Sequence, residues 1–314
     1  MNKSLASVNA TREVLERHGL YTKHSLGQNF LISESVLIRI AKLADLKSDD
    51  VILEVGPGIG TLSKTLLDNV GRIIAVERDK DLPVVLEDTL AKSFDRRFFL
   101  IQKDALDLTE DDILSVQKDN PVLPGKFVAN LPYAVAATLV LDYFERFGFL
   151  ESATVMVQKE VADRMSAAPG SKTYGAYTVK LNLYARPVGR FAVGPDNFFP
   201  KPHVESSVIR FERVIRLDKD GNELSQNELR AASIMADAAF ASRRKTISNS
   251  CRTYFAGVGK VSFGGIDKTG SEISYLLPAI FNEVGIDAGI RGEALGLDTY
   301  ISLGQALLKC CFKG

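Results

Sequence analysis

The chain has 314 residues, of which 46% are hydrophobic and 25% are charged, and its formal net charge is zero. This length is sufficient for one α/β core and a smaller companion domain. A neutral chain has no general attraction to a polyanion, so any nucleic-acid surface has to be local.

The three cysteines, Cys251, Cys310 and Cys311, form no C-x-x-C pair. They argue against a disulfide framework and against a zinc site, and they favour a reducing cytoplasm; we expect no metal. The first twenty residues lack the apolar core of a signal peptide, and no run has the length of a membrane span. We therefore expect neither secretion nor membrane insertion.

In the first half of the chain, short apolar runs alternate with segments whose apolar residues have helical spacing. Helices are predicted at residues 9–18, 33–43, 62–67, 82–94, 135–144 and 159–165, and strands at residues 51–55, 72–76, 98–102, 126–129 and 153–158. Strands separated by helices imply an α/β fold with a doubly wound, mostly parallel sheet that is covered on both faces.

The second half of the chain changes character. Residues 179–186 and 207–211 are apolar and β-prone and suit late strands, whereas residues 218–222 are polar. Helical spacing at residues 229–240, 273–284 and 300–308 predicts a small all-helical domain. The expected division is an N-terminal extension at 1–23, an α/β domain at 24–214 and a helical domain at 215–314, with the boundary near residues 212–222.

A glycine-rich turn follows the first predicted strand of the sheet. Glu54 precedes Gly56, Gly58 and Gly60 at the carboxyl end of that strand, where doubly wound sheets bind ligands. The third glycine comes one residue too early for a dinucleotide fingerprint, which disfavours a pyrophosphate. S-adenosylmethionine has no phosphate and suits such a loop. The alternative is a tight turn without a ligand.

Two acidic residues end the next two strands. Glu77 is placed to accept hydrogen bonds from ribose hydroxyls, and Asp104 to accept from the adenine amino group of the cofactor. Together with the glycine turn, they predict an S-adenosylmethionine site.

Asn130-Leu131-Pro132-Tyr133 closes the fourth predicted strand. The Asn130 side-chain oxygen and the Leu131 carbonyl can accept the two hydrogens of an adenine amino group and direct its lone pair at a methyl donor. Pro132 stiffens the turn, and Tyr133 offers a face on which an extruded base stacks. Phe198 is a candidate for the opposite wall of the base pocket, with an ordinary core aromatic as the alternative.

These motifs resemble the KsgA-type small-subunit rRNA adenine dimethyltransferases, within the superfamily that also contains the Erm resistance methylases. The resemblance runs from about His24 to Leu308 through several motifs in family order. They are Leu26 to Leu31, Glu54 to Gly60, Glu77, Asp104-Ala105, Asn130 to Tyr133, Phe198 to Val204 and Phe240 to Thr246.

The resemblance implies a Rossmann-like methyltransferase that dimethylates two adjacent adenosines near the 3′ end of 16S rRNA, in the precursor of the small ribosomal subunit. It also implies a monomer. Phe30 is expected near the substrate entrance. The residues expected to border the cofactor on this basis are Gln28, Asn29, Leu31, Arg78 and Ala105, with Asn130.

A basic segment in the helical domain is the candidate RNA surface. Arg243, Arg244 and Lys245 lie in a stretch without acids, and Lys201 lies in the proline-rich loop. They are expected to contact phosphates, although runs of charge also occur as solvated faces.

Leu131 and the segment at residues 243–246 favour the small-subunit branch over an Erm-type large-subunit enzyme. A DNA adenine methyltransferase is expected to need a larger recognition region. The further alternative is a relative that acts without catalysis, as a ribosome-assembly checkpoint or a transcription factor.

Overall fold

The computed structural model describes residues 4–21, 28–263 and 265–312. Their chain divides into two compact units, one formed by residues up to 162 together with 187–213, and the other by residues 163–186 together with those from 214 onward. Among the helices in these described ranges, none is both long and apolar enough to cross a bilayer. Residues His24, Leu26 and Gly27, which belong to the predicted motifs, lie outside the described residues.

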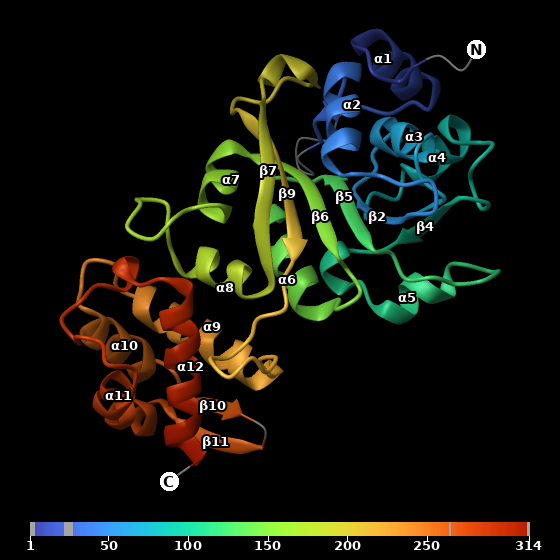
Figure 1. Ribbon diagram of the computed structural model, residues 1–314. Helices are drawn as coiled ribbons and strands as arrows, with labels where there is room; N and C mark the ends of the chain where they lie inside the picture. Colours follow the sequence, from blue (N-terminus) through green and yellow to red (C-terminus); the bar gives the residue numbers. More distant parts are fainter. Residues whose placement is uncertain (1–3, 22–27, 264, 313–314) are drawn as a thin grey trace. The chain divides into compact units, whose positions relative to one another are not determined.

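Seven strands of the described chain form the sheet of the first unit, in the order β4-β3-β2-β5-β6-β9-β7 (Figure 1). Pairs from β4 to β6 are parallel, and β9 is antiparallel to β6. The strands are β2 (Val51–Val55), β3 (Arg72–Glu77), β4 (Phe98–Gln102), β5 (Lys126–Asn130), β6 (Ser152–Gln158), β7 (Ala185–Val193) and β9 (Ser206–Arg213). The doubly wound, mostly parallel sheet is confirmed. Because the chain runs outward on both sides of β2 and β5, a ligand crevice is expected at the carboxyl ends of these two strands.

Helices cover both faces of this sheet. One buried cluster joins Leu37 of α2, Leu66 of α3 and Leu86 of α4 to Val128 of β5. The neighbouring Phe127 points to the other face, where its ring lies 5.1 Å from that of Tyr143 in α6. The helices of this unit are α1 (Val8–Arg17), α2 (Glu34–Leu43), α3 (Thr61–Leu67), α4 (Pro83–Thr89), α5 (Glu110–Ser115), α6 (Ala136–Arg146) and the start of α7 (Lys159–Met165), with the short turns η2 (Ala105–Asp107) and η3 (Pro195–Asn197).

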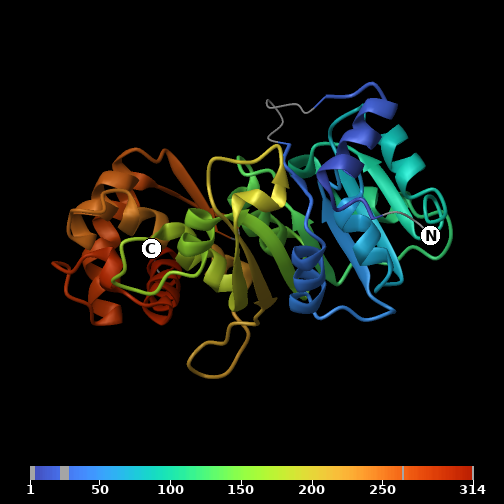
Figure 2. The same cartoon turned by 90° about the horizontal axis from the view of Figure 1, so that it is seen from above.

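A two-stranded ribbon that the sequence did not predict lies outside the sheet. Its strands, β1 (Phe30–Leu31) and β8 (Phe198–Phe199), pair Phe30 with Phe199 and Leu31 with Phe198. The N-terminal helix α1 lies beside α4, where Arg17 and His18 both contact Asp88 (Figures 1 and 2).

The second unit is mainly helical and has its own buried core. Its elements are α8 (Ala176–Tyr184), α9 (Gln226–Phe240), α10 (Ile247–Ala256), α11 (Gly270–Val284), η4 (Gly292–Ala294), α12 (Leu297–Phe312) and the hairpin of β10 (Lys260–Phe263) and β11 (Ile266–Thr269). Capping boxes start two helices, Ser225 with Glu228 at α9 and Thr269 with Glu272 at α11.

The strand predicted at residues 179–186 is wrong over most of its length, because residues 176–184 form α8. Val179, Leu181 and Leu183 alternate with Lys180 and Asn182, which is the period of a half-buried strand, and in α8 these three apolar side chains are all buried. Packing of Ala176 and Val179 in the core of the second unit stabilises the helix in spite of this period. The helix predicted at residues 82–94 is also shorter, since α4 ends at Thr89.

Gly304 sets the distance between α12 and α9. A Cβ at this position would lie 2.8 Å from the Cα of Ala232, on the backbone of the facing helix. We expect Gly304→Ala to lower the free energy of unfolding by about 1–3 kcal/mol, because the backbones must separate. Thermal unfolding and amide exchange in α9 and α12 measure this effect.

Gly296→Ala is the matched control, since a Cβ there would meet nothing within 4 Å. Equal stability of the two variants would contradict close packing of α12 on α9.

Candidate cofactor and catalytic site

One cavity of about 620 Å³ lies within the first unit, at the carboxyl ends of β2, β3, β4 and β5. This volume is typical of small-molecule sites. It brings together segments that are far apart in the sequence. The lining includes Gln28 to Leu31, Glu54 to Gly58, Glu77 to Asp79, Lys103 to Ala105, Asn130 to Val135, Leu139 and Gln158.

The glycine turn after β2 forms one wall. Gly56 and Gly58 have φ angles of +67° and +60°, which side chains rarely adopt. A Cβ on Gly58 would also lie 3.1 Å from Cε1 of Phe30. Gly60 does not line this cavity; it caps α3 with φ +83° and packs against Leu86 and Leu90 of α4. The turn thus needs glycine both for its backbone and for room.

Glu54 is buried in the cavity wall, with 1% of its surface exposed. Its Oε2 atom has no hydrogen-bond partner among the described residues. Burial raises the pKa of Glu54 from 4.5 to about 8, against the lowering effect of the nearby Ser63 hydroxyl, which lies outside hydrogen-bond geometry; the carboxyl is therefore mainly protonated at neutral pH. An unpartnered carboxyl oxygen in a cavity is suited to a ligand that donates hydrogen bonds, and a bound positive charge would favour the ionised form of Glu54.

Glu77, at the end of β3, is also buried and accepts a hydrogen bond from the backbone N–H of Asp79 at 2.8 Å. Burial raises the pKa of Glu77 above its usual value. Its Oε1 atom is thereby fixed in place beside the glycine turn.

Asp104 follows β4 and is ionised. The backbone N–H of Leu106 donates to Oδ1 at 3.1 Å, and the Arg78 guanidinium contacts Oδ2 at 3.0 Å; these two contacts lower the pKa of Asp104. A carboxylate has about four acceptor positions, so it can accept further hydrogen bonds from a ligand.

The segment at residues 28–31 connects the end of β3 to the predicted catalytic turn at residues 130–133. Gln28 donates to Asp79 Oδ2 at 2.9 Å, and the Asn29 carbonyl accepts from Asn130 Nδ2 at 3.2 Å. Phe30 packs with Val14 and Leu15 of α1, next to Gly58.

The turn of Asn130 to Tyr133 is held from several sides. The Leu131 N–H donates to the Met156 carbonyl at 3.2 Å, and the Leu131 side chain is buried. The Tyr133 hydroxyl lies 2.7 Å from Oγ of Ser206, a fully buried residue of β9. Because Asn130 uses its amide nitrogen on Asn29, its Oδ1 is left as the acceptor at the cavity.

Phe198 is not brought into this cavity. Its side chain is 3% exposed and packs in the core with Leu31 and Val36. Phe198 therefore does not line this cavity, and its place in a base pocket stays a prediction.

The predicted RNA residues lie in both units. Lys201 pairs with Asp196 in the first unit. In the second, between α9 and α10, Arg244 and Lys245 are exposed, while Arg243 pairs with Glu293 at 2.9 Å.

Sequence reasoning missed Asp79, Gln158 and Leu139 in the lining, and Ser206 behind Tyr133. Asp79 had a signal, since it follows the strand-ending Glu77 by two residues. Ser206 had none, because a contact across 73 residues has no local pattern.

Comparison with known proteins assigns the family. A family model described as ribosomal RNA adenine dimethylase matches residues 19–269. The chain belongs to this family.

Curated relatives cover nearly the whole chain. Proteins called ribosomal RNA small subunit methyltransferase A from Lachnoclostridium phytofermentans and Listeria innocua are 37% and 35% identical to it. The first match covers 95% of both chains, and the second covers 98% of both.

Two solved structures share the fold. A dimethyladenosine transferase from Plasmodium falciparum has a TM-score of 0.66 at 19% identity, covering 87% of this chain and 95% of that one. The 23S rRNA methyltransferase ErmE has a TM-score of 0.60 at 22% identity, covering 89% of this chain and 99% of that one. The Rossmann-like fold predicted from the sequence is confirmed.

The raised pKa of Glu54 makes stability depend on pH. Between pH 4.5 and about 8 the folded protein holds a proton on Glu54 that the unfolded chain releases, so this group's contribution to stability is lost as pH rises. Glu54→Gln stays neutral. We expect its stability relative to wild type to increase from pH 5 to pH 8, by at most about 1.4 kcal/mol per pH unit.

Thermal unfolding of the ligand-free protein at several pH values measures this difference. A wild-type-to-variant difference that stays constant with pH would contradict the burial of an ionisable Glu54.

Proposed function

We propose that this protein transfers methyl groups from S-adenosylmethionine to N6 of two adjacent adenosines near the 3′ end of 16S rRNA. In this proposal it acts as a cytoplasmic monomer on the small-subunit precursor and contributes to ribosome biogenesis. The observation that carries the proposal is that Asn130 to Tyr133 and the residues Gly56, Glu77 and Asp104 line one cavity. Membership of the adenine dimethylase family and the names of the curated relatives support it.

The polar groups of the cavity fit this cofactor. When bound, S-adenosylmethionine supplies a methyl group on a positively charged sulfur. Glu77 accepts from ribose hydroxyls and Asp104 from the adenine amino group. The unpartnered Oε2 of Glu54 suits the amino group at the methionine end, beside Gly56 and Gly58. Gln28, Asn29, Leu31, Arg78 and Ala105 complete the border.

The catalytic turn prepares the target nitrogen. An adenine amino group is a weak nucleophile because its lone pair is delocalised into the ring. Oδ1 of Asn130 and the carbonyl oxygen of Leu131 accept its two hydrogens, which turns the lone pair towards the methyl donor and stabilises the positive charge that develops. The methylated nitrogen then loses a proton to solvent, so catalysis consists mainly of positioning and electrostatics.

The remaining groups hold the substrate. Tyr133 stacks on the extruded base, and the hydroxyl of Ser206 fixes its ring. Lys201, Arg243, Arg244 and Lys245 contact phosphates. Methyl transfer belongs to the domain at residues 24–214, which also supplies Lys201, and the other three RNA contacts belong to residues 215–314.

Substrate choice is tested with radiolabelled S-adenosylmethionine and three acceptors: unmethylated small-subunit particles, naked large-subunit RNA and DNA. We expect label only in the small-subunit RNA, because the relatives of 35–37% identity are named for that substrate. Label in large-subunit RNA would favour an Erm-type enzyme. Absence of label in all three would favour a binding role without catalysis.

Asn130→Ala removes one of the two acceptors for the amino group. We expect kcat to fall by about 10²–10³-fold or more, with cofactor affinity nearly unchanged. Single-turnover methylation and calorimetric cofactor binding separate the two effects. Full activity of the variant would refute the role of Asn130.

A further inference from the structure

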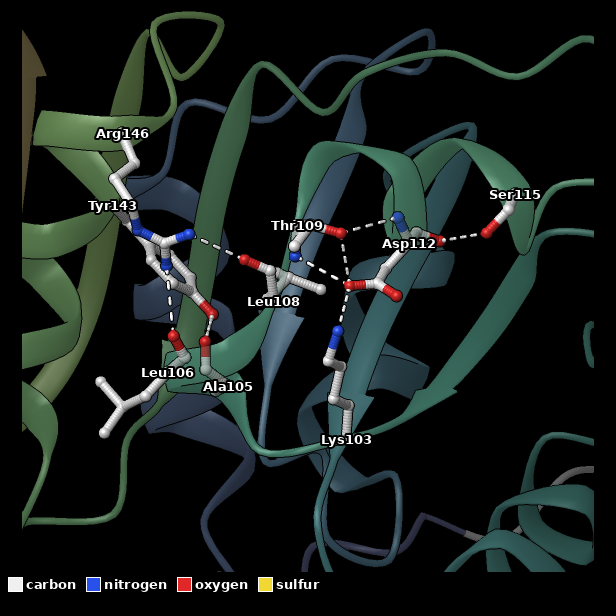
Figure 3. A network of polar contacts seen from close by, with 9 residues as sticks. All are labelled: Lys103, Ala105, Leu106, Leu108, Thr109, Asp112, Ser115, Tyr143 and Arg146. Atoms are coloured by element: carbon white, nitrogen blue, oxygen red, sulfur yellow. Dashed lines mark hydrogen bonds and ion pairs between the residues drawn. The ribbon is translucent and has the colours of Figure 1, made fainter.

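The loop after β4 presents Asp104 and Ala105 to the cavity, yet much of its backbone is held from another part of the chain. The residues that hold it belong to α6, the helix that follows the catalytic turn. Figure 3 shows Tyr143 and Arg146 of α6 facing the backbone of Ala105, Leu106 and Leu108.

Tyr143 makes the first of these contacts. Its hydroxyl donates to the Ala105 carbonyl at 2.8 Å, and its side chain is fully buried against Phe127 of β5. Burial raises the pKa of Tyr143, so the hydroxyl keeps its proton and remains a donor at physiological pH.

Arg146 makes the others. Its Nη1 donates to the Leu108 carbonyl at 2.8 Å, and its Nη2 reaches the Leu106 carbonyl at 3.5 Å. Asp142, one helical turn earlier, accepts from Nε at 2.8 Å and fixes the guanidinium plane. Three carbonyls of one short loop are thereby held by two side chains of one helix.

The other end of the loop is held by its own neighbours. Thr109 and Asp112 form a capping box at α5, and Lys103 pairs with Asp112 at 2.6 Å (Figure 3). These contacts are local and do not reach the catalytic turn. Among the contacts drawn in Figure 3, only those of α6 connect the loop to the catalytic turn. Helix α6 begins three residues after Tyr133, and its Leu139 lines the cavity.

We propose that Tyr143 and Arg146 are positioning residues for the cofactor. They hold the backbone of residues 105–108 so that Asp104 and Ala105 meet the adenine end of S-adenosylmethionine, in register with the catalytic turn at the other end of α6. The inference rests on the proposed function, because it concerns the same cofactor.

Tyr143→Phe removes the hydroxyl and keeps the buried ring. We expect the Kd of S-adenosylmethionine to rise about 3- to 10-fold, as for the loss of one hydrogen bond, with kcat at saturating cofactor within about twofold of wild type. Methylthioadenosine, which keeps the adenine end and lacks the amino-acid end, is the second probe. Its Kd should rise by the same factor.

Tyr300→Phe is the matched control. Tyr300 is fully buried in the second unit, and its hydroxyl donates to the Gly292 carbonyl at 2.8 Å. The variant Tyr300→Phe loses the same kind of hydrogen bond, so its thermal stability should fall as that of Tyr143→Phe does. Its Kd values for S-adenosylmethionine and methylthioadenosine should stay at those of the wild type. Arg146→Lys is a second test, at a half-exposed side chain. Lysine keeps the positive charge but lacks the planar guanidinium that donates to the loop carbonyls.

Unchanged Kd values in Tyr143→Phe and Arg146→Lys would overturn the inference, as would an equal loss of affinity in Tyr300→Phe. An increase in Kd for the full cofactor but not for methylthioadenosine would overturn it too. A wild-type protein that binds neither probe would instead count against the proposed function.

Discussion

The hydrogen bond from Asn130 Nδ2 to the Asn29 carbonyl is the interaction on which the site depends. A carboxamide has one donor end and one acceptor end, so fixing the nitrogen on a backbone oxygen decides where Oδ1 points. Asn29 is itself held, because Gln28 is bonded to Asp79 and Leu31 is paired with Phe198. The segment at residues 28–31 and the turn at residues 130–133, to which we assign the cofactor and the substrate, are therefore one connected structure.

Several polar groups of the cavity are held by hydrogen bonds within the protein before a ligand enters. The backbone N–H of Asp79 fixes Glu77, Arg78 and a loop amide fix Asp104, and Ser206 fixes Tyr133. Polar groups fixed in advance need not reorganise when charge moves in the reaction, and such preorganisation is the largest contribution in many enzymes. Helix α6 connects the turn at residues 130–133 to the loop at residues 105–108, whose carbonyls accept from Tyr143 and Arg146.

The parallel sheet and much of the cavity lining were predictable because their signals are local. A strand ending in Glu77, or in Asn130 before a proline, needs only a few neighbouring residues to be seen. Phe198 shows the limit, since the same motif fits a pocket wall and a core position, and only packing against Leu31 and Val36 decides between them. The α8 helix and the Tyr133–Ser206 contact were not predicted, because both depend on packing between residues that are distant in the sequence, which the pattern within one segment does not report.

A crystal structure with S-adenosylhomocysteine and an adenosine-containing RNA tests the orientation of Asn130 most directly. The amide held by Asn29 should place Oδ1 of Asn130 and the Leu131 carbonyl oxygen each within about 3 Å of the target N6 atom. The ring of Tyr133 should lie against the same base. A target adenine bound outside the cavity, or an Asn130 amide turned so that Nδ2 faces N6, would contradict this chemistry.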